Sequence, residues 1–426
     1  MKNILAALLS LIWFAAYAQE DQLLVRLKAL PDVAEVQPAR VDPLFKSGYE
    51  LRIRQPLDHA NPSGKTFLQS VYLSHADFDK PVLFETEGYS ARSGSMPKEL
   101  TSILKCNQII VEHRYFGKSS PDTLHWQYLT TKQAADDHHH IVQLLKSLYR
   151  GKWISSGTSK GGQTTLFFRY YYPKDVDVSV AYVAPVNVSQ EDPRLIKFLR
   201  AVGTEEVREK IKKYQIAMLK REPEMLPMID TLAKKRNLTF SIGRTLAYEY
   251  GILEYACSFW QSGHSADQIP PPDAPADSMM NYFDKIGTLF YYTDRGIKTF
   301  EPFQYQAYTE IGYYGYDISD FKQYLTAMKN PTNSILAPRN VELKFNPVTM
   351  YNVYSWLRDY GSNIIYIYGE TDLWGATAVE LSGMTNALKI VKKGGAHSTR
   401  IRTLPREQQE QVFGALEEWL GINLEW

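Results

Sequence analysis

The chain has 426 residues, of which 44% are hydrophobic and 22% charged, a balance that is ordinary for a folded globular protein. Its formal net charge of +1 excludes a strongly basic or acidic chain, so nothing in the composition indicates a nucleic-acid binder or a trap for acidic substrates. We therefore expect no nucleic-acid partner, and either one large domain with an insertion or two domains.

The first 18 residues have the pattern of a secretory signal peptide. Lys2 supplies the positive charge, residues 4–16 the apolar stretch, and Ala16-Tyr17-Ala18 the small-residue cleavage site. This stretch is too short to span a bilayer, and no later segment has about 18 uninterrupted apolar residues. We expect an exported protein, periplasmic or secreted, with no stable membrane insertion; an uncleaved anchor is the alternative.

Strands and helices alternate through the next part of the chain, residues 19–187. The pattern predicts antiparallel strands over 49–55 and 67–75, buried strands over 81–85, 108–112, 153–156 and 176–185, and helices over 134–149 and 163–172. Such alternation is typical of a parallel sheet that is covered by helices on both faces.

The pattern changes between residues 188 and 340. Charged helical segments (205–220 and 227–235), a proline-rich stretch (269–275) and an aromatic block (282–324) replace the buried strands. Alternation then returns in residues 341–426, with strands over 363–368 and 388–391 and helices over 376–384 and 405–420. We predict an α/β chain with the α/β-hydrolase fold, interrupted by a mainly helical cap over residues 188–340.

The run Gly157-Thr158-Ser159-Lys160-Gly161 has the pattern of a nucleophile elbow. A serine on a sharp strand-to-helix turn has strained backbone angles and presents its hydroxyl at the top of a sheet. The glycines two residues before and after it leave room for the close packing that this turn forces. Because the pattern is short, a small-residue turn with an inert serine is the alternative interpretation.

An activated serine needs a base, and that base needs an orienting acid. In α/β-hydrolases these follow the serine in the order Asp, then His. Asp372 and His397 each follow a predicted buried strand, and ligands of open α/β sheets bind beyond the carboxyl ends of the strands. Ser159, Asp372 and His397 are therefore the predicted catalytic triad, with Glu370 as a rival for the acid.

The oxyanion of the reaction needs two hydrogen-bond donors. One is predicted to be the N–H of Lys160, directly after the serine, and the other the N–H or hydroxyl of Tyr89, in the loop after an early strand. An ordinary glycine-containing turn is the alternative for that loop. The Lys160 side chain is expected to point away and to pack or form a salt bridge, without a catalytic role.

No metal or other cofactor is expected. His138, His139 and His140 are consecutive in a predicted helix, where they point in different directions and cannot converge on one ion. The two cysteines, Cys106 and Cys257, have no metal-ligand pattern around them; they could form one disulfide or remain two buried thiols.

With these residues in place, the chain resembles the bacterial secreted tripeptidyl aminopeptidase family of serine peptidases, and more distantly the prolyl carboxypeptidase and dipeptidyl peptidase group. The most specific stretches are His113-Arg114-Tyr115-Phe116-Gly117-Lys118-Ser119 and Ser159-Lys160-Gly161-Gly162. Softer likenesses lie at residues 55–59, 61–62, 85–89, 303–310 and 372–374. The distant group has Tyr or a similar residue where Lys160 stands, which favours the tripeptidyl family.

The resemblance implies an exopeptidase that releases short peptides, with tripeptides as the leading expectation, from substrates with a free N-terminus. Such a site needs acidic partners for the substrate ammonium, and Glu87 and Glu310 are the candidates. Each could instead be a structural ion-pair partner. A dipeptidyl or prolyl peptidase, an esterase or lipase with the same triad, and a non-catalytic hydrolase fold are the alternatives.

Overall fold

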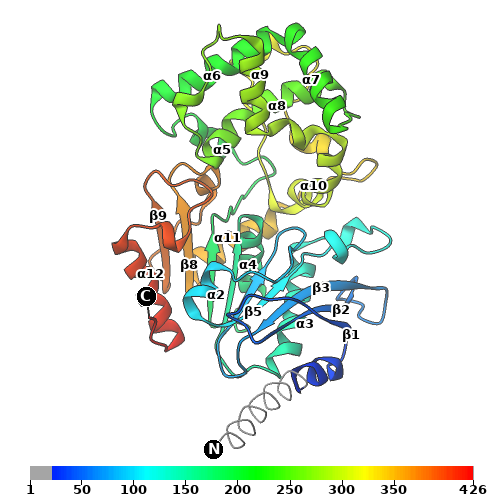
Figure 1. Cartoon of the computed structure of the whole chain (residues 1–426), viewed down its shortest axis with the longest axis vertical. Helices are drawn as coiled ribbons and strands as arrows, with labels where there is room; N and C mark the ends of the chain where they lie inside the picture. Colours follow the sequence, from blue (N-terminus) through cyan, green and yellow to red (C-terminus); the bar gives the residue numbers. More distant parts are fainter. Residues whose placement is uncertain (1–21, 426) are drawn as a thin grey trace, which may run out of the picture.

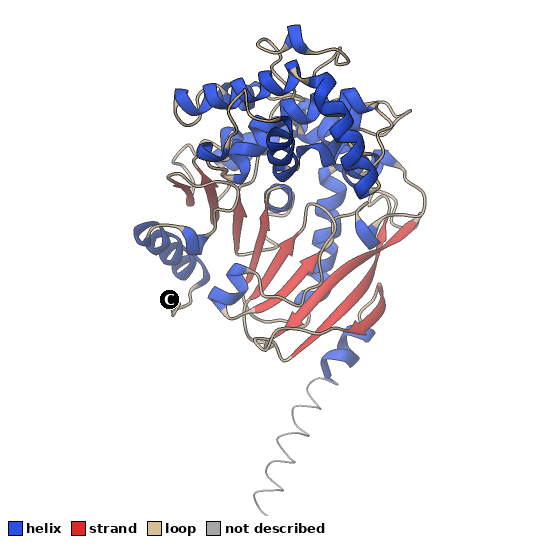
Figure 2. Cartoon of the chain, turned by 45° about the horizontal axis from the view of Figure 1, so that its top comes forward, coloured by secondary structure: helices blue, strands red, loops and turns tan. Residues whose placement is uncertain are grey.

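The computed structural model describes residues 22–425, so the predicted signal peptide lies outside the described residues. A twisted sheet forms the lower half of the molecule and a group of helices forms the cap above it (Figures 1 and 2). Within residues 22–425 no helix is both long and apolar enough to cross a bilayer.

The strands are β1 (Val33–Pro38), β2 (Ser47–Pro56), β3 (Thr66–His75), β4 (Val82–Thr86), β5 (Asn107–Val111), β6 (Trp153–Thr158), β7 (Val178–Tyr182), β8 (Ile364–Gly369) and β9 (Ala387–Lys392). Residues 22–29 are helical. The helices that follow are α2 (Glu99–Leu104), α3 (Thr131–Lys146), α4 (Lys160–Tyr171), α5 (Pro193–Leu199), α6 (Glu205–Lys220), α7 (Glu222–Arg236), α8 (Arg244–Ser262), α9 (Ala276–Ile286), α10 (Asp294–Gln306), α11 (Pro347–Asp359) and α12 (Arg406–Leu420). The eight predicted strands are confirmed as β2 to β9.

The nine strands have the order β1-β2-β3-β5-β4-β6-β7-β8-β9. The pairs from β1 to β5 are antiparallel, and every pair from β5 across to β9 is parallel. The exchange of β4 and β5 and the antiparallel edge are the topology of the α/β-hydrolase fold, as predicted. The carboxyl ends of β4, β6, β7, β8 and β9 consequently share one edge, below the cap.

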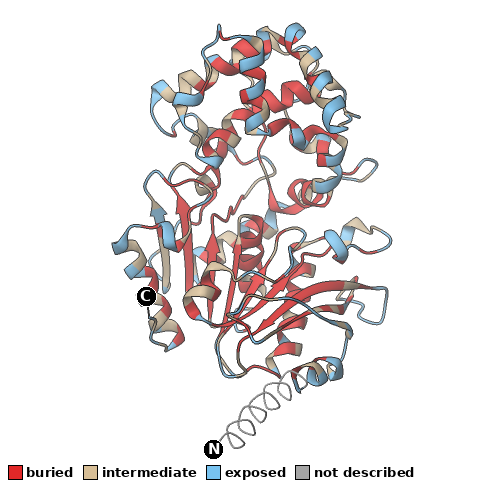
Figure 3. Cartoon of the chain, viewed as in Figure 1, coloured by how far each residue is buried: buried red, intermediate tan, exposed pale blue. Residues whose placement is uncertain are grey.

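Helices cover both faces of this sheet, and alternate residues of one strand enter different cores. In β4, Val82 and Phe84 pack with residues of α3, whereas Leu83 packs with residues of α2 and α12. A third cluster joins α4 and α11 over β7 and β8. The central strands are therefore buried on both sides (Figure 3), which explains their nearly continuous apolar sequences.

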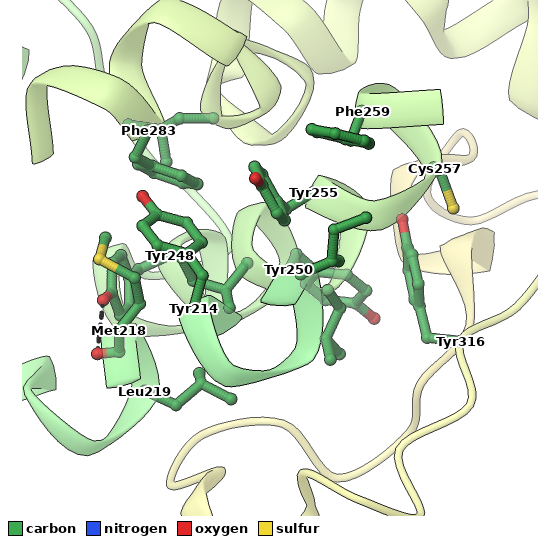
Figure 4. Packing of buried hydrophobic residues seen from close by; sticks show 14 of the residues in the cluster. Tyr214, Met218, Leu219, Tyr248, Tyr250, Tyr255, Cys257, Phe259, Phe283 and Tyr316 are labelled. Atoms are coloured by element: carbon green, nitrogen blue, oxygen red, sulfur yellow. Dashed lines mark hydrogen bonds between the residues drawn. The ribbon is translucent and has the colours of Figure 1, made fainter. Parts of the chain in front are cut away.

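The cap has its own core, which is rich in tyrosine (Figure 4). Its members come from α6, α7, α8 and α9 and from the segment after α10. They include Leu373 and Trp374 from the loop after β8, so this loop joins the cap to the sheet. Both cysteines are free and buried, Cys257 in the cap core and Cys106 between the sheet and α12.

The prediction of a helix over residues 376–384 is wrong. A 3₁₀ turn, Leu373–Thr377, ends there and the chain continues without helix. Ala378 and Val379 enter the core beside α11, and Lys389 donates to the Val379 carbonyl at 3.1 Å. The apolar spacing of residues 376–384 therefore belongs to a buried irregular segment. The sheet is covered here by α11, a helix that the sequence pattern did not predict.

One buried ion pair connects the loops around β5 to helix α3. Arg114 and Asp137 are fully buried and joined by two hydrogen bonds of 2.7 Å, and Arg114 also donates to the carbonyls of Leu57 and Tyr128. Burial alone would raise the pKa of Asp137, but Arg114 and His59 lower it overall. The stability that this pair contributes is therefore present at neutral pH and lost as the pH falls through the lowered value.

We expect Asp137→Asn to destabilise the protein by about 3–5 kcal/mol, because it leaves the Arg114 charge buried without its partner. Urea unfolding at pH 7 measures the effect. Asp79→Asn, which breaks an ion pair with Arg150 on the surface, should leave the unfolding midpoint nearly unchanged. Equal midpoints for the two variants would contradict this role of the buried pair.

Candidate active site

Ser159 lies between β6 and α4 with backbone angles that few non-glycine residues adopt. Its φ is 57° and its ψ is −124°, and its N–H donates to the Tyr182 carbonyl of the neighbouring strand at 2.8 Å. A serine held in this strained turn points its side chain out of the strand direction. The side chain is partly exposed and lines a cavity under the cap.

The start of α4 lies directly against the loop after β4. A Cβ atom on Gly88 would come within 2.6 Å of the Lys160 carbonyl carbon, and one on Gly161 would come within 2.6 Å of the Thr86 carbonyl oxygen. Only residues without a side chain allow the backbones to approach this closely. The contact brings the Gly88–Tyr89 peptide to the N-terminal end of α4, beside Ser159.

Asp372 and His397 are hydrogen-bonded to each other. The His397 Nδ1 lies 2.9 Å from Asp372 Oδ2, and the Asp372 carboxylate is fully buried whereas His397 is partly exposed. Glu370, the rival acid, instead accepts from the Gly394 N–H at 2.7 Å. In the described part of the chain, Ser159 and His397 make no hydrogen bond to one another.

The cap holds the histidine loop in place. The Gln261 carbonyl on α8 accepts from the His397 N–H at 2.9 Å, and its side chain accepts from the Trp374 indole at 3.3 Å. One cap residue thus contacts the loops that carry both Asp372 and His397.

The Lys160 side chain is buried next to the serine. Its ammonium donates to the Gly88 carbonyl at 2.7 Å and lies 5.5 Å and 5.3 Å from the ring centres of Tyr89 and Phe116. Burial lowers the pKa of Lys160 to about 7. The expected packing is present, but within residues 22–425 no carboxylate forms a salt bridge with this lysine.

The predicted oxyanion donors are the N–H of Lys160 and the N–H or hydroxyl of Tyr89. Within residues 22–425 neither N–H group donates a hydrogen bond, so both are free to bind a ligand. The Tyr89 ring lines the cavity beside Ser159, and burial raises the pKa of its hydroxyl well above the usual value near 10. The hydroxyl is therefore neutral and can still donate.

The cavity beside Ser159 measures about 270 Å³ and lies between the sheet and the cap. Aromatic residues are the largest group in its wall, among them Tyr89, Phe300, Phe303, Tyr313 and Trp374. Its polar groups include Glu254, Ser258 and Gln261 from one face of α8, together with Gln304 from α10. A larger hollow of about 510 Å³ near β2 and α3 shares no lining residue with this cavity.

The two glutamates predicted to bind a substrate ammonium both lie elsewhere. Glu87 pairs with Lys98 at 2.8 Å, and both oxygens of the buried Glu310 accept from Thr131. Neither lines the cavity. Glu254 was missed, although its spacing of four and seven residues from Ser258 and Gln261 puts three polar groups on one face of an otherwise apolar and aromatic helix.

The three consecutive histidines have separate partners. His139 pairs with Asp175 at 2.6 Å, His140 with Gln55 at 2.8 Å, and His138 packs against Phe84 and Phe168. These contacts stabilise α3 against the sheet.

A strained serine at an elbow, an Asp–His pair on later strands and this sheet order define a serine hydrolase of the α/β-hydrolase class. The profile of the family described as PS-10 peptidase S37 matches residues 26–424. The chain belongs to this family and is a serine peptidase, which confirms the resemblance drawn from its sequence.

Two curated proteins and one solved structure illustrate what the chain is similar to. The chain is 32% identical to a prolyl tri/tetrapeptidyl aminopeptidase of Streptomyces mobaraensis, over 87% of this chain and 79% of that protein. It is 30% identical to the human lysosomal Pro-X carboxypeptidase, over 42% of this chain and 41% of that protein. A crystal structure of a proline iminopeptidase from Mycobacterium smegmatis superposes with a TM-score of 0.41 at 12% identity, covering 87% of this chain and all (100%) of the other.

We expect Gly161→Ala to lower kcat by about 100-fold, because the new methyl group would push the serine turn away from the Thr86 carbonyl and misplace the nucleophile. Steady-state kinetics measure the loss. Gly414→Ala is the matched control: its Cβ would meet nothing within 4 Å in the exposed face of α12, so activity should stay unchanged and stability should rise by about 0.5–1 kcal/mol. A fully active Gly161→Ala enzyme would contradict the close contact.

Proposed function

We propose that the protein is an exported aminopeptidase that releases tripeptides, or tetrapeptides, from the free N-terminus of peptides. The observation that carries the proposal is the strained Ser159, which opens into a small cavity closed by the cap. A cavity of this size admits a short peptide end rather than a folded chain. The name of the Streptomyces relative supports the tripeptide or tetrapeptide product and a preference for proline at the cleaved bond.

In the proposed reaction the Ser159 oxygen attacks the carbonyl carbon of the scissile bond. His397 takes the serine proton and gives it to the leaving amine as the C–N bond breaks, and Asp372 holds the histidine in the correct tautomer. Water then attacks the acyl-enzyme with His397 as base. This step frees the short peptide with a new carboxylate and restores the serine hydroxyl.

The contact between Ser159 and His397 that this mechanism needs is part of the proposal. Catalytic hydrogen bonds of free enzymes are commonly long and tighten when substrate binds. The Asp372–His397 hydrogen bond and the buried aspartate support the orientation of the base.

An esterase with the same triad is the second candidate. A lipid-binding cap should line the cavity mainly with aliphatic side chains. Here the lining contains several tyrosines, a glutamate and two glutamines, with Ile286, Ile297 and Leu336 as its aliphatic members. This composition favours a peptide substrate.

The first test compares two fluorogenic tripeptide amides with proline before the leaving group, one with a free and one with an acetylated N-terminus. We expect cleavage of the free form with much higher kcat/KM, and mass spectrometry should find intact tripeptides. Ser159→Ala should abolish both cleavage and labelling by a fluorophosphonate. Undiminished labelling of the variant would contradict the triad, and equal cleavage of the two substrates would contradict the aminopeptidase activity.

Lys160 is proposed to position the oxyanion site through its side chain as well as its N–H. The Gly88 carbonyl that accepts from the ammonium and the proposed donor, the Tyr89 N–H, belong to the same peptide group. A cationic donor on the carbonyl end fixes this peptide and polarises its N–H, so that the N–H becomes a stronger donor to an oxyanion.

We expect Lys160→Met to lower kcat about 10-fold with little change in KM, because the effect concerns the transition state. The same variant should unfold at an equal or higher temperature. A lysine pKa of about 7 in the folded protein lies below the usual value near 10.4. The unfolded chain therefore binds more protons between these values, and the buried charge costs stability below pH 7.

Steady-state kinetics of Lys160→Met check the expected loss of kcat. Thermal unfolding at pH 6 and pH 8 checks the expected change in stability. The gain in unfolding temperature should be larger at pH 6, where the wild-type lysine is charged. A lower unfolding temperature with unchanged kcat would make Lys160 a purely structural residue.

A further inference from the structure

We propose that Glu254, on cap helix α8, binds the N-terminal ammonium of the substrate, and that the side-chain carbonyl of Gln304 on α10 is the second acceptor. The inference rests on the proposed aminopeptidase function and names the residues that would restrict it to free N-termini. It replaces Glu87 and Glu310, which the structure places outside the cavity.

Glu254 is a buried acid with no cation beside it. Its side chain accepts hydrogen bonds from Tyr314 at 2.8 Å, Tyr316 at 2.7 Å and Ser258 at 3.3 Å, and the residue is 5% exposed. Within residues 22–425 no lysine, arginine or histidine forms an ion pair with it. Hydroxyl donors orient the carboxylate but do not neutralise it, so a bound ammonium would supply the missing counter-charge.

Gln304 supplies an independent indication of a ligand in the same cavity. The residue is only 4% exposed. Its buried side-chain carbonyl has no hydrogen-bond partner among the described residues. A buried acceptor without a donor costs free energy unless a ligand or water satisfies it. An ammonium carries several N–H donors and could satisfy Glu254 and Gln304 together.

The groups that face the Glu254 carboxylate are neutral hydroxyl and thiol groups. They are Ser258 and Cys257 of α8, Tyr291 and Tyr292 of the turn before α10, and Tyr313, Tyr314 and Tyr316 of the segment after α10. Burial raises the pKa of Glu254 to about 7, and the tyrosine and serine hydrogen bonds oppose the rise. The acid therefore ionises near neutral pH, and a substrate ammonium would favour the ionised form.

A fixed binding site for the substrate ammonium would also determine the length of the released peptide. The same cavity holds Ser159, so the span from Glu254 to Ser159 would set how many residues fit between the N-terminus and the cleaved bond. Each residue lengthens an extended peptide by about 3.3–3.6 Å. A peptide with one residue more or fewer between the anchor and the cleaved bond would therefore place the wrong carbonyl at Ser159.

The test uses the free and acetylated tripeptide substrates and reports the ratio of their kcat/KM values. We expect Glu254→Gln to lower this ratio about 10- to 100-fold by weakening the free-amine substrate alone, the loss expected for one charge-assisted contact. Fluorophosphonate labelling of Ser159 should proceed at the wild-type rate, which shows that the triad is intact. Product analysis with longer peptides should show a wider range of product lengths than the wild-type enzyme gives.

Three matched variants make the test specific. Glu249 lies on the same helix, is fully buried and accepts from the backbone of residues 326–328, away from the cavity. Glu249→Gln therefore perturbs the cap without touching the anchor, and its substrate ratio should stay at the wild-type value. Glu87→Gln and Glu310→Gln should also keep that ratio.

The wild-type enzyme provides a test that does not depend on how any variant folds. The ratio should rise as the pH passes through about 7, where Glu254 ionises, and fall as the substrate amine loses its proton near pH 7.7–8.0. The titration of the catalytic groups affects both substrates equally, so it cancels in the ratio of their kcat/KM values. A ratio that is flat from pH 5 to pH 7.5 would overturn the assignment.

The outcomes separate this inference from the proposed function. A wild-type ratio near one overturns the aminopeptidase function itself. A high wild-type ratio that persists in Glu254→Gln, or that Glu249→Gln, Glu87→Gln or Glu310→Gln lowers to the same extent, overturns only the role of Glu254.

Discussion

The active-site half of the molecule depends on the contact between two backbones, the loop after β4 and the first turn of α4. Gly88 and Gly161 allow them to approach to distances that no side chain permits. Because the loop and the helix start touch, the peptide between Gly88 and Tyr89 lies beside Ser159. The strained angles of the serine are held from the other side by the hydrogen bond to Tyr182. Removing either contact would let the turn relax towards ordinary angles.

The cap belongs to the active site as much as the sheet does. Leu373 and Trp374, which directly follow the proposed catalytic aspartate, are part of the cap core. Gln261 binds the backbone of His397 and the indole of Trp374. A cap that moved as one body would therefore pull on the loops of both the acid and the base. Cap packing is thus coupled to the geometry of these catalytic loops as well as to substrate access.

The sequence predicts those parts of the structure that depend on local patterns. Strands buried on both faces are apolar runs, and the elbow glycines and the order of Asp372 and His397 follow from chain position alone. The helix over residues 376–384 failed because an irregular segment packed into a core has apolar residues at similar spacings. Glu254 on α8 and Glu310 in the turn after α10 are both acids of the cap segment, and only the packing of the folded chain shows that Glu254 lines the cavity whereas Glu310 accepts from Thr131. The same holds for Lys160, whose burial depends on Tyr89 and Phe116.

The two buried ionisable residues of the site, Lys160 and Glu254, favour one orientation of a bound peptide. Lys160 and the N-terminal end of α4 make the serine end electropositive, where negative charge develops on the substrate carbonyl. Glu254 makes another part of the same cavity electronegative. A peptide that enters with its ammonium towards Glu254 satisfies both charges at once. A peptide that enters with its carboxylate first would place like charges together unless Glu254 took up a proton. The distribution of charge therefore favours the proposed removal of residues from the N-terminus.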